Sequence, residues 1–154
     1  MIDLEKLLEP DSLKGFLKND FGRTWKHFQG EFGRFEYLIT EEKLLDILSR
    51  NEAPLQSISL IHAGQRLAPE LYGSPGQAPQ SIRLDIQKIK QHLLQGSALL
   101  ITHLERLVRP LWDCTESLGQ IFEETVTVNA YLGGPNSNRF DLHIDHHDVL
   151  VFQV

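Results

Sequence analysis

The chain has 154 residues, of which 41% are hydrophobic and 23% charged, and its formal net charge is −6 at pH 7. This is the composition of an ordinary globular protein, and the length favours one domain with its own core. The acidic balance argues against a general nucleic-acid or anionic-membrane surface, which needs clustered Lys and Arg, and no apolar stretch is long enough to span a bilayer.

The single cysteine, Cys114, excludes an internal disulfide and fits a reducing compartment, and we expect it to be half-buried on a helix. Residues 1–6 lack a basic stretch followed by an apolar run, so they do not form a signal peptide. We therefore expect a soluble, cytoplasmic protein.

The first third of the chain is expected to be mainly helical. Residues 2–19 hold a short amphipathic helix and room for a second, with a break at Glu9-Pro10-Asp11. A run of aromatic residues follows, and we expect it to form a small core under a looped arm, because no basic stripe is interleaved with it. The run comprises Phe16, Phe21, Trp25, Phe28, Phe32 and Phe35.

The middle third predicts two capped helices and two strands. Thr40 caps a helix with acids in its first turn, and Asp85 caps another that ends at Gly96. The apolar face of the first helix is Leu44, Leu45, Ile47 and Leu48, and that of the second is Ile86, Ile89, Leu93 and Leu94. Segments 56–62 and 98–102 are apolar enough for strands. Segment 63–81, rich in Gly and Pro, predicts a long loop with Tyr72 as a surface anchor.

The last third changes from helical to strand patterning. Residues 103–122 predict a helix that Pro110 splits or restarts. Residues 125–131 alternate, with Val126, Val128 and Ala130 on one side and Thr127, Asn129 and Tyr131 on the other. After a turn at 133–138, we expect a strand over 140–145 and a central one over 149–154. This order predicts an α+β fold, with a helical N-terminal region packed on β-structure.

The chemistry is concentrated in His143-Ile144-Asp145-His146-His147-Asp148. On a strand, His143 and Asp145 point to the same side, and one imidazole with one carboxylate makes two thirds of the 2-His-1-carboxylate triad that binds non-haem Fe(II). A surface cluster of His and Asp is the competing interpretation. We place His146, His147 and Asp148 in a loop around the metal, with His147 as the substitute ligand if the site closes locally.

A second metal chemistry has a weaker claim. Residues 141–146 resemble the His-x-His-x-Asp-His signature of metallo-β-lactamase-type hydrolases, with Asp141 in place of the first His. A polar turn precedes the segment where that family has a buried strand, so this is a distant alternative.

Three segments carry a more specific resemblance. The first is Leu7-Leu8-Glu9-Pro10 with Phe16-Leu17 and Trp25-Lys26. The second is Gly96-Ser97-Ala98-Leu99-Leu100-Ile101 with Leu104 and Pro110-Leu111. The third is Asn129-Ala130-Tyr131-Leu132, then Pro135, then Phe140-Asp141-Leu142-His143-Ile144-Asp145 and Asp148-Val149-Leu150-Val151-Phe152-Gln153. In order and spacing, these resemble the cupin-type Jumonji-C oxygenases, in particular the branch of the ribosomal oxygenases.

The resemblance implies an Fe(II)- and 2-oxoglutarate-dependent hydroxylase on a double-stranded β-helix, or jelly roll. His143 and Asp145 match the first two iron ligands, and Asn129 and Tyr131 match positions that line the cosubstrate pocket. The implied reaction couples decarboxylation of 2-oxoglutarate to hydroxylation of a protein or peptide side chain, ribosomal proteins being substrates of some members. No direct nucleic-acid or membrane partner is implied.

The family's third ligand and its basic cosubstrate anchor lie further downstream than Val154. We therefore expect a truncated fold, in which 1–122 form a mainly helical N-terminal region and 123–154 the first strands of the β-helix within a single domain. Two functional hypotheses follow. One is an oxygenase represented by its N-terminal part. The other is a non-catalytic module that associates, as a homo-oligomer, through an exposed strand edge.

Overall fold

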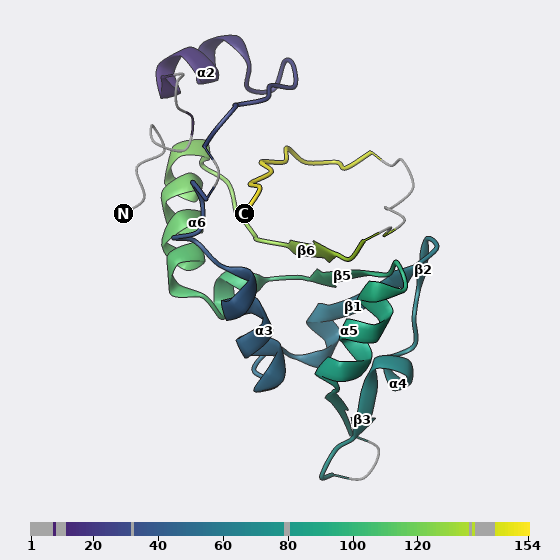
Figure 1. Ribbon diagram of the computed structural model, residues 1–154. Helices are drawn as coiled ribbons and strands as arrows, with labels where there is room; N and C mark the ends of the chain where they lie inside the picture. Colours follow the sequence, from purple (N-terminus) through teal and green to yellow (C-terminus); the bar gives the residue numbers. More distant parts are fainter. Residues whose placement is uncertain (1–7, 9–11, 32, 79–80, 136, 138–143) are drawn as a thin grey trace.

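The computed structural model describes residues 8, 12–31, 33–78, 81–135, 137 and 144–154. Helices and antiparallel sheets alternate along the chain, which confirms the α+β class (Figure 1). Among the described residues the first strand begins at residue 58, so the region before residue 122 carries strands as well as helices. No helix in the described part of the chain is long and apolar enough to cross a membrane.

The larger sheet has four antiparallel strands in the order β2-β1-β5-β6. Their bounds are β1 Ile58–His62, β2 Gln65–Arg66, β5 Ala98–Ile101 and β6 Ala130–Gly133. Ala63 and Gly64 join β1 to β2, and both have positive φ, as the two-residue turn of a tight hairpin requires. A second sheet pairs β3, Gly73–Pro75, with β4, Ile82–Leu84.

The α-helices are α2 Leu13–Asn19, α3 Glu41–Ser49, α4 Pro69–Tyr72, α5 Ile86–Leu94 and α6 Arg109–Phe122. Two 3₁₀ turns, η1 Leu55–Ser57 and η2 Leu104–Arg106, precede β1 and α6. Pro110 lies in the first turn of α6, where its missing N–H costs nothing, so it restarts the helix as predicted.

Both predicted caps are confirmed. The Thr40 hydroxyl accepts a hydrogen bond from Lys43 N at 3.2 Å. The Asp85 carboxylate accepts hydrogen bonds from the backbone N–H groups of Gln87 and Lys88 and from the Ser74 hydroxyl. The bond from Ser74, together with those backbone bonds, lowers the pKa of Asp85 because each stabilises the charged form.

One face of the larger sheet packs into the core. Ile58 and Leu60 of β1 and Leu99 and Ile101 of β5 are buried there, and the helices supply the opposite wall. The most buried helical side chains in this wall are Ile47 and Leu48 of α3 and Ile89 of α5. The apolar residues on one side of each helix and those on one face of the sheet are therefore buried in one common layer.

The aromatic run forms the expected small core for part of its length. The Phe16 ring lies 5.9 Å from Phe21 and 5.7 Å from Phe28, and Phe21 stacks on Phe122 of α6 at 4.6 Å. Trp25 was expected among them but is 86% exposed, because it follows the turn that ends α2 and extends away from the packed rings. Phe32 lies outside the described residues.

Three expectations for the middle of the chain are wrong. Segment 63–81 contains β2, α4 and β3 rather than one long loop, since Pro69 starts a helix instead of breaking one. Tyr72 is 1% exposed and belongs to the core, with its hydroxyl donating to the Ile58 carbonyl at 3.4 Å. Leu94 is 72% exposed because it is the last residue of α5 and has passed the sheet.

The predicted central strand over 149–154 is also wrong. No strand is formed in 144–154, and Val149, Val151 and Val154 are more than half exposed. Phe152 is the residue of this segment that packs, with its ring 4.9 Å from that of Phe35. A strand requires a ladder partner, and within the described residues β6 pairs with β5 alone.

The cap of α3 gives a direct test of the fold. Replacing the Thr40 hydroxyl in Thr40→Ala removes the partner of Lys43 N and should lower the free energy of unfolding by about 1 kcal/mol. Thr40→Ser keeps the acceptor and should unfold at nearly the same urea concentration as the wild type. Equal stabilities of the alanine variant and the wild type in urea titrations would contradict the cap.

Candidate functional site

The predicted metal ligands lie in the segment that follows β6. His143 is outside the described residues, so the geometry of the His143–Asp145 pair is not on view. Asp145, His146, His147 and Asp148 are all exposed, and the backbone bends at His146–His147. The described end of the expected strand over 140–145, Ile144 and Asp145, is not in a strand.

Within the described part of the chain, no three or more His, Cys, Asp or Glu side chains lie close enough to hold a metal ion. This concerns His146, His147, Asp145 and Asp148 but not His143. A carboxylate with imidazoles is a donor set that suits Fe(II), so the residue types fit a non-haem iron. A site would need His143 and at least one further ligand.

The residues before the metal segment are arranged as the alternation predicts. Val126, Val128 and Ala130 are half-buried and pack against the core, while Asn129 is exposed and Tyr131 is 61% exposed. Strand β6 begins only at Ala130, so the alternation starts before the ladder does. Asn129 and Tyr131 therefore share the side of the chain that faces away from the core.

Tyr131 stands at the end of a row across the sheet. The register pairs Ser59 with Leu100 and Leu100 with Tyr131, all on the face opposite the core. Ser59 is 3% exposed, Leu100 is intermediate and Tyr131 is 61% exposed, so the face opens toward β6. The open end is at β6, the strand that precedes Asp145 in the sequence (Figure 1).

Gly134 fixes the path of the chain as it leaves β6. A Cβ at this position would collide with the Leu93 carbonyl at the end of α5, so the backbones touch there. A glycine is required for such a close approach. The segment that leads to His143 and Asp145 therefore starts from a fixed point on α5.

A functionally placed residue that the sequence analysis missed is Glu105, in η2. Its side chain is 6% exposed, and its Oε2 accepts a hydrogen bond from Val128 N at 2.9 Å. Oε1 lies 3.3 Å from His103 Nδ1 and 3.8 Å from Arg106 Nε. The available signal was an acid between the apolar residues Leu104 and Leu107, close before a helix, but the pattern gave it no partner.

Two other histidines and the cysteine show no catalytic arrangement. His103 has φ of 57° and joins β5 to η2, and His62 Nδ1 lies 3.1 Å from the fully buried Ser97 hydroxyl. Cys114 lies on α6, as expected, and is buried. Burial raises the pKa of its thiol, which favours the protonated form over the nucleophilic thiolate.

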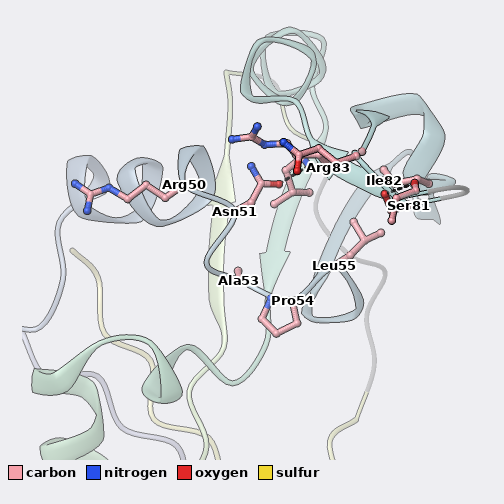
Figure 2. A pocket seen from close by; sticks show the side chains of 12 residues that line it. Arg50, Asn51, Ala53, Pro54, Leu55, Ser81, Ile82 and Arg83 are labelled. Atoms are coloured by element: carbon pink, nitrogen blue, oxygen red, sulfur yellow. Dashed lines mark hydrogen bonds between the residues drawn. The ribbon is translucent and has the colours of Figure 1, made fainter.

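An open hollow of about 540 Å³ lies between the end of α3 and the β3–β4 sheet (Figure 2). Asn51 accepts a hydrogen bond from Leu84 N at 2.6 Å, while the Arg50 guanidinium pairs with Asp46 at 2.8 Å and points away from the other labelled side chains (Figure 2). Among the described residues that line it, there is no carboxylate, imidazole or thiol. The described lining of the hollow therefore lacks the side-chain groups that acid–base or metal chemistry most often uses.

No known protein-family model matches the chain, and no curated protein is significantly similar to it.

Proposed function

We propose that this chain is part of an Fe(II)- and 2-oxoglutarate-dependent oxygenase that hydroxylates a protein or peptide side chain. The observation that carries the proposal is the alternation at 126–131, which exposes Asn129 and Tyr131 on one side of the chain, and Tyr131 lies twelve residues before His143 in the sequence. In the Jumonji-C oxygenases that this sequence resembles, the matching residues line one pocket. The antiparallel sheet β2-β1-β5-β6 would then belong to a double-stranded β-helix.

In this proposal His143 and Asp145 hold the metal, with His147 as the third ligand if the site closes locally. When bound, Fe(II) with 2-oxoglutarate and oxygen supplies the oxidising chemistry, and the protein contributes position and polarity. The exposed Asn129 amide and Tyr131 hydroxyl would donate hydrogen bonds to the cosubstrate carboxylate, and the apolar Leu100 between Tyr131 and Ser59 would form the floor. The open face at β6 would admit an extended peptide.

Metal binding tests the proposal directly. Anaerobic addition of Fe(II) and 2-oxoglutarate to the chain should produce the visible metal-to-cosubstrate charge-transfer band, and Asp145→Ala should abolish it by removing the anionic ligand. The control is Glu116→Ala, which removes an exposed carboxylate on α6, outside the metal segment, and should leave the band. A wild-type chain without the band, or equal bands in all three proteins, would contradict the assignment of Asp145 as a ligand in this chain.

The cosubstrate pocket has its own test. A hydrogen bond to a charged group is worth about 1.5–3 kcal/mol, so Tyr131→Phe should weaken 2-oxoglutarate binding by about ten-fold or more. The 2-oxoglutarate concentration at half-maximal band intensity measures this. Tyr37→Phe, which removes a half-exposed hydroxyl in the N-terminal region, should leave that concentration unchanged. An unchanged value in Tyr131→Phe would exclude its hydroxyl from the pocket.

The exposed apolar side chains near the C-terminus favour a second candidate, a module that associates with another copy of itself. Ile144 is 88% exposed and Val151 83% exposed, and both follow β6, which lies at one end of the strand order. Extended apolar segments beside a sheet edge readily pair with an edge of another chain.

Sedimentation without metal tests this association. The wild type should form a dimer, and Val151→Lys should weaken dimerisation by at least about ten-fold, because a lysine is poorly accommodated in an apolar interface. Leu94→Lys, on the exposed end of α5, is the matched control and should dimerise like the wild type. A monomeric wild type would rule this candidate out.

A further inference from the structure

Val128 is held at both of its backbone groups by η2. Its carbonyl accepts a hydrogen bond from Leu104 N at 2.9 Å, and its N–H donates to Glu105 Oε2 at 2.9 Å. One bond comes from backbone and the other from a side chain. The two bonds together tie the start of the β6 segment to the turn that follows β5.

The two bonds extend the hydrogen-bonding pattern between β5 and β6 beyond the last residue pair of these strands. The pairing of β5 with β6 ends at Ile101 and Ala130, so continuing the register would place His103 opposite Val128. His103 has φ of 57° and ψ of 39°, which turns the chain away from the sheet. In an antiparallel pair, alternate residues bond to the same neighbour, so Val128 presents its N–H and C=O toward β5 as Ala130 does. The Glu105 carboxylate takes the place of the missing strand carbonyl.

Glu105 is suited to this role because its carboxylate is buried and well supplied with donors. A buried carboxylate is costly unless it is paired. Here Val128 N satisfies one oxygen, while His103 Nδ1 at 3.3 Å and Arg106 Nε at 3.8 Å approach the other. These contacts come from both sides of the turn, so the carboxylate has a fixed position from which to hold Val128.

We propose that Glu105 is a positioning residue, whose carboxylate fixes the backbone at Val128 and thereby keeps Asn129 on the exposed side of the chain that it shares with Tyr131. The inference rests on the proposed function only where it concerns cosubstrate binding. If the bond to Val128 N is lost, residues 125–129, which lie outside β6, are held to the turn after β5 by the Leu104 N–Val128 O bond without its partner bond, and the backbone at Asn129 can turn where β6 begins. Asn129 then no longer shares the direction of Tyr131, which stays paired with Leu100 in β6.

Amide hydrogen exchange on the full chain tests the positioning. Glu105→Ala should speed exchange at Val128 by about ten-fold or more, while Leu60 and Leu99 in the centre of the sheet keep their wild-type rates. Glu105→Gln keeps an oxygen in the same place and should return the Val128 rate to within about three-fold of the wild type. Glu116→Ala, an exposed acid on α6, is the matched control and should exchange like the wild type.

Three results would overturn the inference: an unchanged Val128 rate in Glu105→Ala, an equal acceleration at Leu60 and Leu99, or equal rates in the Ala and Gln variants.

A second measurement separates this inference from the proposed function. If iron and 2-oxoglutarate bind, Glu105→Ala should raise the 2-oxoglutarate concentration for half-maximal band intensity several-fold without changing that for Fe(II), and Glu105→Gln should restore it. Altered exchange without any band would uphold the role of Glu105 and refute the oxygenase; a band with unaltered exchange would do the reverse.

Discussion

The structure depends on one strand, β5, pairing along both of its edges. Its four residues bond to β1 on one side and β6 on the other, and Leu99 and Ile101 are fully buried against the helices. The helical layer and the segment that bears Asn129 and Tyr131 therefore meet at this strand. Because β5 is so short, the turn that follows it must supply the remaining bonds to β6. Leu104 and Glu105 supply them.

Much of the fold could be predicted because it is encoded locally. An N-cap hydroxyl or carboxylate bonds to backbone within three residues, so Thr40 and Asp85 mark their helices without knowledge of the rest. The burial of Tyr72 depends instead on contact with Ile58, fourteen residues away, which composition does not reveal. Segment 149–154 has the composition of a central strand, but a ladder needs a partner, and no pattern in the segment specifies one.

The same distinction between local patterns and long-range contacts applies to the candidate site. The common side of Asn129 and Tyr131 follows from the two-residue period of extended chain, and in the structure both side chains are exposed. The metal pair stays a prediction, since His143 is outside the described residues and Asp145 alone is on view. Glu105 could not have been found from the sequence, because its role comes from a hydrogen bond to Val128, 23 residues further along the chain. A single acid between leucines is equally typical of a solvent-exposed turn.

The position of α6 has a consequence for how the molecule folds. Its 14 residues lie between β5 and β6, and as a helix they span about 21 Å. Until the helix forms, β6 is at the end of a long flexible loop, and closing that loop is entropically costly. Formation of α6 shortens the loop, and the stacking of Phe21 on Phe122 holds its far end against the N-terminal aromatic cluster. Strand β6 is therefore expected to pair with β5 only after α6 has formed and docked. A mutation that weakens α6 would then slow the ordering of Tyr131, although α6 contains none of the candidate site residues.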